Sequence, residues 1–399
     1  MVAVDTDTIT ADVASRLDRA RAAATAAGVA ALVITPGTTL RYLAGYDAVL
    51  SERLTALVLP AAGDPWLLVP RLERAAAAHS GAAGLGVEIR TWTETQDAVA
   101  VLAAGLAAGG VRDGDRVAVD DRMWAEKSLR LGAAAPGVHQ VAAGALVDPL
   151  RMRKTAAEIE ELARAGAAID RVHARMGEWL RVGRTEREVA GDIAAAILDE
   201  GHAAVDFVIV ASGPNSGSPH HHVSDRVVGV GDPVVVDIGG VLESGYRSDC
   251  TRTYTLGPPS AELAAVYAVL QRAQAVAVAA VAPGAVAGDL DETARAVLRD
   301  AGHGELFTHR LGHGIGLDGH EPPWIVDGDR TVVEAGFAFS IEPGCYDEDR
   351  WGARIEDIVV VTEQGVRPLN NRPHELAELP ARTSPPPAER SPLPPRSSA

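Results

Sequence analysis

Hydrophobic residues in the first 146 positions alternate between a helical spacing and short continuous runs. An alanine-rich stretch over 11–27 carries apolar residues at the spacing of a helix. Short branched runs typical of strands cover 29–34, 55–59, 66–69 and 117–120, with helical stretches between them. This alternation predicts a complete α/β domain over residues 1–146.

The pattern changes near Val147-Asp148-Pro149, after which a long amphipathic helix is predicted over 153–182. Thr155 is its candidate N-cap, and Glu158, three residues on, completes the spacing of a capping box. Further helices are predicted over 186–200, 260–281 and 288–301, alternating with strand-like runs. We therefore expect an α+β domain over 150–376, with a curved antiparallel sheet and helices outside it.

The residues from 377 to 399 are predicted to form a disordered tail. Six prolines and four serines fall between 383 and 399 without periodicity. Such a composition buries too little apolar surface to offset the entropy of ordering.

Charge and composition exclude several classes of protein. The 399-residue chain has a net charge of −17, whereas nucleic-acid and anionic-membrane partners both call for basic patches. No apolar stretch approaches the roughly 18 residues of a membrane span, and the first residues lack the basic head and apolar core of a signal peptide. A soluble, cytoplasmic protein is expected. Two cysteines, Cys250 and Cys345, are too few for a disulfide framework.

Four carboxylates in the second half of the chain fall beside predicted strands. Asp237 ends a run of valines, glycine-rich turn residues follow, and Asp249 opens the next strand-like stretch. A hairpin would place these two aspartates side by side. Glu342 follows an apolar run, and Glu356 precedes another. These two glutamates predict a second hairpin with a second pair of carboxylates.

A histidine completes the set. His313 lies in HRLGHGIGLDGH, whose glycines let the backbone approach a bound ion. Carboxylate and imidazole ligands suit Mn, Co or Zn. Carboxylates packed this closely would raise one another's pKa unless cations held them. The sequence therefore predicts one dinuclear metal site and hydrolytic chemistry, with the ligands Asp237, Asp249, His313, Glu342 and Glu356.

Simpler interpretations apply to each feature alone. A single aspartate at the end of a strand is usually a turn or cap residue. The glycines after residue 311 resemble a dinucleotide fingerprint, but Pro322-Pro323 prevents the helix that such a motif requires. Exposed loop or surface positions are expected for His221, His222 and His303.

Several strings resemble the signature segments of the pita-bread metallopeptidases, the family of aminopeptidase P, prolidase and methionine aminopeptidase. These strings are VVVDIGG, GYRSDCTRT, HRLGHGIGLDGHEPP, SIEPGCY and RIEDIVV. The stretch SGPNSGSPHHHVSDRVVGVGD is similar to the segment that carries a substrate-side histidine in the proline-specific branch. The turn between Asp237 and Asp249 is one residue longer than the family pattern. The resemblance implies a pita-bread catalytic domain preceded by a smaller α/β domain of the creatinase type.

The resemblance also implies residue roles. Asp237 would bind one metal ion, Asp249 and Glu356 would bridge two, and His313 and Glu342 would bind the second, with Glu342 also handling protons. Three further histidines would act on the substrate without binding metal, and an arginine and a tyrosine would support the site. These residues are His220, His309, His320, Arg354 and Tyr246.

The expected activity is a manganese-dependent exopeptidase that cleaves the bond between an N-terminal residue and proline in short peptides. Two alternatives stay open: a creatinase-like enzyme acting on a non-peptide carbon–nitrogen bond, and a non-catalytic scaffold. The sequence does not decide between dipeptidase and aminopeptidase P, nor the native metal, nor whether the chain forms a homodimer.

Overall fold

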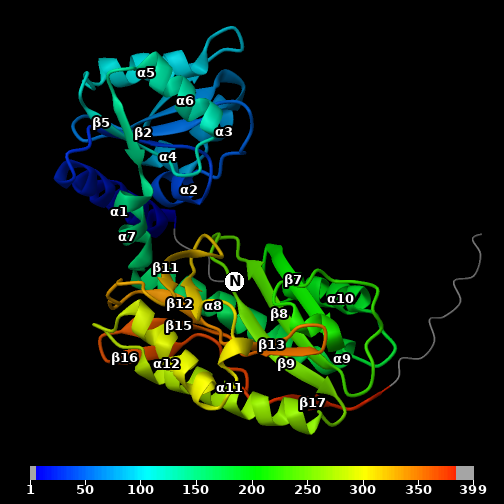
Figure 1. The fold of residues 1–399 in the computed structure, drawn as a ribbon. Helices are drawn as coiled ribbons and strands as arrows, with labels where there is room; N and C mark the ends of the chain where they lie inside the picture. The colour runs from blue at the N-terminus through cyan, green and yellow to red at the C-terminus, as the bar shows by residue number, and fades with distance from the viewer. Residues whose placement is uncertain (1–5, 383–399) are drawn as a thin grey trace, which may run out of the picture. The chain divides into compact units, whose positions relative to one another are not determined.

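The computed structural model describes residues 6–382 and divides into two compact units, Met1–Lys154 and Thr155–Ala399 (Figure 1). The predicted boundary at 147–149 falls inside helix α7 (Gly144–Met152). This helix packs against α1 (Thr6–Ala26), and its Val147 is buried. The segment around Pro149 therefore belongs to the first unit.

The first unit contains a six-stranded mixed sheet in the order β4-β3-β2-β1-β5-β6. Its central strands β1, β2 and β3 are buried along their whole length and pair antiparallel, while the outer pairs are parallel. The predicted strands of this unit are confirmed to within about two residues. The strands are β1 (Ala31–Ile34), β2 (Ala56–Pro60), β3 (Trp66–Pro70), β4 (Glu88–Trp92), β5 (Arg116–Val119) and β6 (His139–Ala142). The helices are α2 (Thr38–Ala44), α3 (Arg74–Ala78), α4 (Gly81–Gly84), α5 (Ala98–Ala108) and α6 (Ala125–Ala134).

The strands of the second unit form two sheets and a separate hairpin. One sheet has the order β17-β9-β8-β7 and the other β11-β10-β12-β15-β16, while β13 pairs only with β14. The Glu356 N–H donates to the Thr251 carbonyl at 3.1 Å, which joins the two sheets. The strands of the first are β7 (Ala204–Ser212), β8 (Pro233–Val241), β9 (Cys250–Leu256) and β17 (Ala377–Leu379). The others are β10 (Gly312–Gly314), β11 (Glu321–Ile325), β12 (Ala338–Ile341), β13 (Gly344–Asp347), β14 (Trp351–Arg354), β15 (Asp357–Thr362) and β16 (Gly365–Pro368).

The helices of the second unit confirm most of the predicted positions. Thr155 and Glu158 form the predicted capping box of α8. The predicted long helix ends early, because Arg175 leaves helical geometry (φ −97°, ψ 3°) and its N–H caps the carbonyls of Val172 and His173. The helices are α8 (Ala156–Ala174), α9 (Met176–Trp179), α10 (Glu186–Asp199), α11 (Ala261–Ala280) and α12 (Ala287–Asp300).

Helix α11 is the one described helix that is long and apolar enough to cross a membrane. It lies beside α12 in Figure 1 and buries a face that includes Leu263, Val266 and Leu270. A core helix of a protein without membrane spans passes the same test.

The predicted disordered tail is wrong at its start. Strand β17 pairs parallel with β9, and Ala377 and Leu379 pack against the core between α8, α10 and the sheet. These two apolar residues give the segment enough buried surface to stay ordered. The proline-rich stretch 383–399 lies outside the described residues.

Candidate metal centre

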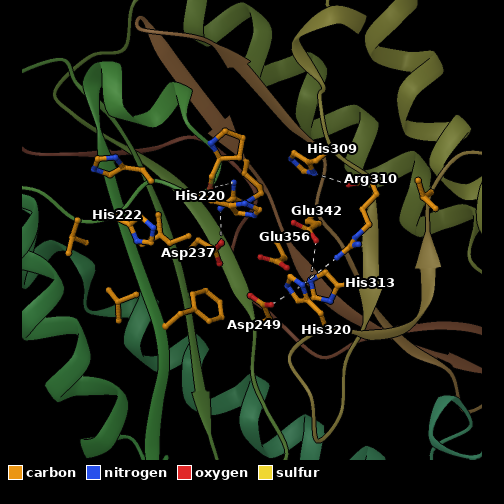
Figure 2. A pocket seen from close by; sticks show the side chains of 18 residues that line it. His220, His222, Asp237, Asp249, His309, Arg310, His313, His320, Glu342 and Glu356 are labelled. Atoms are coloured by element: carbon orange, nitrogen blue, oxygen red, sulfur yellow. Dashed lines mark hydrogen bonds and ion pairs between the residues drawn. The ribbon is translucent and has the colours of Figure 1, made fainter. Parts of the chain in front are cut away.

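Five strands and strand ends bring the predicted ligands together. Asp237 lies within β8, Asp249 directly precedes β9, and His313 lies on β10. Glu342 directly follows β12 and Glu356 directly precedes β15. All five side chains line a cavity of about 860 Å³, and Figure 2 shows them close to one another.

The two predicted hairpins differ in how they form. Strands β8 and β9 are an antiparallel hairpin in which Asp237 lies opposite Thr251. Strands β12 and β15 also pair antiparallel, with Ile341 opposite Asp357, but the β13–β14 hairpin is inserted between them. Glu342 and Glu356 therefore meet across two adjacent strands and not across a simple turn.

The ligand atoms form overlapping groups. Asp237, Asp249 and Glu356 each offer an oxygen within 4.8 Å of the others. A ring nitrogen of His313 and one oxygen each of Glu342 and Glu356 lie within the same distance of one another. Glu356 belongs to both groups, so its carboxylate lies where it can bridge two ions. Asp249 forms a third such group with His313 and His320.

Two carboxylate oxygens fit a cation directly. Asp237 Oδ1 and Asp249 Oδ1 are buried and have no hydrogen-bond partner among the described residues. A buried acceptor without a partner is costly unless an ion satisfies it.

The pKa shifts point the same way. Burial and then the neighbouring carboxylates of Glu356, Asp237 and Glu342 raise the pKa of Asp249 well above its usual range. Burial and the charges of Glu342 and Asp237 raise the pKa of Glu356 likewise. Without positive charge the cluster cannot keep all its carboxylates ionised, and divalent cations supply that charge.

His313 is oriented as a ligand. Its Nδ1 lies 3.1 Å from the Gly314 carbonyl oxygen, which can only accept, so Nδ1 carries the proton. Its Nε2 then faces Glu342 Oε1 at 3.2 Å and Asp249 Oδ2 at 3.8 Å. This contact needs a positive charge, supplied either by a metal ion bound to Nε2 or, without metal, by a proton on Nε2.

Arg354 and Thr251 hold the carboxylates from behind. Arg354 Nη2 donates to Asp237 Oδ2 at 2.6 Å, and its Nε donates to Thr251 Oγ1 at 3.0 Å. Thr251 Oγ1 in turn donates to Glu356 Oε2 at 2.7 Å. Arg354 therefore lies where a supporting arginine was expected.

A tyrosine that was not predicted, Tyr346, contacts Arg354 and His309 of the site. Neither Tyr346 nor Tyr246 is part of the cavity lining, Tyr246 donates to Glu158 Oε1 at 2.6 Å, and its supporting role stays a prediction. The Tyr346 hydroxyl accepts from Arg354 Nη1 at 2.7 Å and lies 2.9 Å from His309 Nε2. Because His309 Nδ1 donates to the Arg310 carbonyl at 2.7 Å, its Nε2 accepts the Tyr346 proton. Tyr346 lies on β13, so it reaches the site only through the inserted β13–β14 hairpin.

His320 is arranged as a neutral donor. Its ring stacks near His313, with centroids 3.8 Å apart, and its Nδ1 accepts from Arg310 Nη2 at 3.3 Å. Burial and the His313 charge lower the pKa of His320 to about 4. Its Nε2–H is then free to hydrogen-bond a substrate oxygen.

The remaining histidines considered in the sequence have different surroundings. His220 lies in the cavity lining on an exposed loop, as expected. His222 is exposed and His303 is half-buried. His221 is wrong as a surface residue, because its Nε2 lies 2.8 Å from Glu186 Oε2, a fully buried carboxylate. Sequence spacing gives no signal for a partner 35 residues away.

Comparison with known proteins decides the family. The model of metallopeptidase family M24 matches residues 160–363, and that of the creatinase/prolidase N-terminal domain matches residues 16–153. The chain belongs to metallopeptidase family M24. Membership implies divalent metal ions, and the cluster described above can hold them.

Relatives of this M24 metallopeptidase are named as peptidases. A probable dipeptidase PepE of Mycobacterium bovis is 53% identical over 367 residues, covering 92% of this chain and 96% of the relative. The crystal structure of dipeptidase PepE from Mycobacterium ulcerans has 55% identity and a TM-score of 0.89, covering 93% of this chain and 99% of that one. A prolidase from Thermococcus sibiricus has 34% identity and a TM-score of 0.85, covering 91% and 98%. The protein is therefore a peptidase with a pita-bread catalytic domain and a creatinase-type N-terminal domain.

Arg310 is a charged residue of the cavity lining that was not predicted. Arg310 of this M24 enzyme lies with its guanidinium 4.5 Å from the Trp324 ring centroid. Among residues 6–382 it forms no ion pair with a carboxylate, whereas Arg354 pairs with Asp237. Its place in HRLGHG, three residues before a metal ligand, was the available signal.

Proposed function

We propose that this peptidase uses two divalent ions, most suitably Mn²⁺, to hydrolyse the bond between an N-terminal residue and proline in dipeptides. The observation that carries the proposal is the pair of ligand groups that share Glu356 at the wall of one cavity. Carboxylate-rich sets suit Mn²⁺, and Co²⁺ or Zn²⁺ are the alternatives. When bound, two ions would activate water and polarise the scissile carbonyl.

The chain's own residues would supply donors and proton transfer. The His320 Nε2–H would hydrogen-bond the oxyanion as it develops. Glu342 would carry a proton toward the leaving nitrogen, and Ser340 Oγ, which donates to Glu342 Oε1 at 3.0 Å, orients that carboxylate. His309 and Tyr346 would position Arg354, and His220, which lines the same cavity, would face the substrate.

The residues that line the cavity support proline as the second residue of the substrate. The imide nitrogen has no N–H, so peptidases that grip an extended backbone through that N–H handle it poorly. This cavity combines histidines with the apolar side chains of Phe207, Val208 and Ile209. Such a wall can accept a pyrrolidine ring without requiring that N–H.

Dipeptides are favoured by Arg310. The carboxylate of a dipeptide lies a few bonds from the scissile carbon. The Arg310 guanidinium, which pairs with no carboxylate in the described part of the chain and lies beside His320, suits it. In longer peptides a neutral amide occupies that place. The relatives named dipeptidase support the same choice.

The test compares four substrates with Mn²⁺-loaded protein: Ala-Pro, Ala-Pro amide, Ala-Pro-Ala and Ala-Ala. We expect Ala-Pro to be cleaved fastest and Arg310→Ala to remove most of the preference for Ala-Pro over its amide. Equal rates on Ala-Pro and Ala-Ala would contradict the proline assignment. Faster cleavage of Ala-Pro-Ala would identify an aminopeptidase P instead.

A further inference from the structure

Glu186 is a fully buried carboxylate that accepts six hydrogen bonds. Its Oε1 accepts from Ser212 N at 2.8 Å, Ser212 Oγ at 2.8 Å and Asn215 Nδ2 at 3.0 Å. Its Oε2 accepts from Ser224 N at 3.0 Å, Ser224 Oγ at 2.7 Å and His221 Nε2 at 2.8 Å. Every donor comes from the segment between the end of β7 and residue 224.

The carboxylate is ionised at neutral pH. Burial raises the pKa of Glu186, but the hydrogen bonds from Ser224, Asn215, Ser212 and His221 lower it to about 2. A buried charge is costly unless its acceptor positions are filled. Six donors therefore have to converge, which fixes the path of the segment that provides them.

This segment carries His220 toward the cavity between two anchors. On one side the Pro219 carbonyl accepts from Arg354 Nη1 at 3.3 Å, and Arg354 also holds Asp237. On the other side His221 is held by Glu186. His220 itself is exposed and forms part of the cavity lining, so its direction depends on its neighbours.

The start of α10 and the segment 224–226 are also joined by backbone hydrogen bonds that do not involve the Glu186 carboxylate. The Glu186 N–H donates to the Arg226 carbonyl at 3.0 Å, and the Arg187 N–H donates to the Ser224 carbonyl at 3.1 Å. The Glu186 side chain adds hydrogen bonds that fix the loop 213–223, a segment in which the described backbone forms no strand pairing. The surface pair Arg187–Asp225 spans the same segments, but its side chains are 59% and 79% exposed and contribute little.

We propose that Glu186 is a positioning residue for His220, acting through the His221 side chain to keep the His220 ring directed into the cavity. The proposal rests on the proposed function in one respect, that His220 serves peptide hydrolysis. His221 is the link because it is the next residue in the chain and bonds the carboxylate directly.

The test uses the full-length protein with Glu186→Gln, His221→Ala and His221→Gln, and Asp225→Asn as the matched surface control. Two readouts are taken: kcat and KM for Ala-Pro with Mn²⁺, and the ¹H–¹³C signal of the His220 ring in Zn²⁺-loaded protein, assigned by its loss in His220→Ala. Metal content is measured for each variant.

His221→Ala should lower kcat by about 10², the effect typical of a misplaced active-site group. Its KM and metal content should stay close to wild type. His221→Gln, whose amide can still donate to Glu186, should recover most of the rate. The His220 signal should be single in wild type, His221→Gln and Asp225→Asn, and broadened or doubled in His221→Ala and Glu186→Gln.

Wild-type kcat and an unchanged His220 signal in His221→Ala would overturn the proposal. So would a loss of rate that His221→Gln does not restore, since any packing change at residue 221 would then explain it. If wild-type protein fails to cleave Ala-Pro, the proposed function fails, but the His220 signal still decides whether Glu186 positions that ring.

Discussion

Single residues at the metal centre divide into ligands and the groups that orient them. Asp237 and Asp249 each leave a buried oxygen without a hydrogen-bond partner among the described residues, which is where an ion would bind. Arg354, Thr251 and Ser340 each donate a hydrogen bond to one ligand carboxylate, those of Asp237, Glu356 and Glu342 respectively. The carboxylate cluster was predictable because each of the four carboxylates borders an apolar run, and His313 because it lies among glycines. The contacts of Tyr346 with His309 and of Glu186 with His221 were not, because these partners are 37 and 35 residues apart in sequence.

The first prediction concerns Asp249, which belongs to the ligand group with Asp237 and Glu356 and to the group with His313 and His320. Asp249→Asn removes a negative charge and one ligand oxygen, so at least one ion should be lost. Activity should fall by more than about 100-fold, the upper range for residues that only support a ligand. Metal analysis and the rate on Ala-Pro check this, with Asp225→Asn as the surface control. Full occupancy and full rate would rule out a dinuclear site.

The second prediction concerns His320, the neutral histidine that can donate a hydrogen bond to the substrate oxygen. His320→Ala should leave metal content intact and lower kcat by about 10²–10³, the loss expected for one oxyanion donor. His303→Ala, a half-buried histidine outside the cavity lining, should keep the wild-type kcat. If His320→Ala instead released an ion, the residue would be a ligand in the group it forms with Asp249 and His313.

Secondary-structure elements position the ligands through close backbone approaches. The β8–β9 hairpin was predictable because both aspartates lie on neighbouring strands joined by one turn. The β12–β15 pair was predicted only as a simple hairpin, since nothing in the local pattern distinguishes the inserted β13–β14 from a turn. Strand β10 is too short to be recognised from the sequence pattern. Its glycines are needed because the backbones of Ser340 and Pro322 leave no room for a side chain at Gly312 and Gly314.

The third prediction tests that requirement. A methyl group at Gly312 would lie 1.9 Å from the Ser340 carbonyl oxygen, so Gly312→Ala must push β10 away from β12. The His313 N–H would then lose its 3.0 Å contact with Ser340 Oγ. Metal affinity should fall about 10–100-fold, measured by competition with a chelator.

Gly191→Ala is the control for this change. Gly191 lies within α10 and has no atom within 4 Å of an added methyl group. Alanine there should raise stability slightly, by about 0.5–1 kcal/mol, with no effect on metal. Unchanged metal affinity in Gly312→Ala would show that β10 can shift without displacing His313.

The fourth prediction concerns the packing of α8 on β9. His173 is buried, with Nε2 3.1 Å from the Cys250 carbonyl and Nδ1 2.9 Å from the Tyr254 hydroxyl. Burial and the Arg252 charge lower its pKa from 6.5 to about 3. As pH falls, His173 is therefore protonated in the unfolded chain before it is protonated in the folded protein. The contribution of neutral His173 to folding stability is complete above pH 6.5 and is lost as pH falls toward 3.

His173→Gln removes this titration while keeping a donor for the Cys250 carbonyl. Between pH 6 and 5 the free energy of unfolding should fall less steeply for His173→Gln than for wild type. The two slopes should differ by about 1.4 kcal/mol per pH unit. Denaturant unfolding at matched metal concentration measures the difference. Parallel curves for the two proteins would show that His173 binds its proton in the folded state.

On the scale of the whole molecule, the metal groups are confined to one unit. Every candidate group found among residues 6–382 lies between Asp237 and Glu356, in the unit Thr155–Ala399. The α/β character of the first unit was predictable because its strands are continuous apolar runs. The number of sheets in the second unit was not, because their separation depends on pairing between distant strands.

The last prediction follows from this confinement. Removing metal leaves the buried carboxylates of the cluster to repel one another, so the loss of stability should start there. Ions at 100 times their dissociation constant stabilise the folded state by about 2.7 kcal/mol. For a unit of this size that corresponds to a fall in Tm of about 5–10 °C on chelation.

Hydrogen exchange followed by mass spectrometry locates the effect. Chelation should raise exchange in peptides covering 234–256, 311–314 and 338–361, which contain the ligands and their strands. Peptides covering the first-unit strands 31–34, 56–60 and 116–119 should exchange as before. Asp249→Asn should exchange like the chelated wild type whether or not metal is added, since its site is already incomplete. Equal loosening of both units would mean that the metal stabilises the chain by a route other than its own ligand strands.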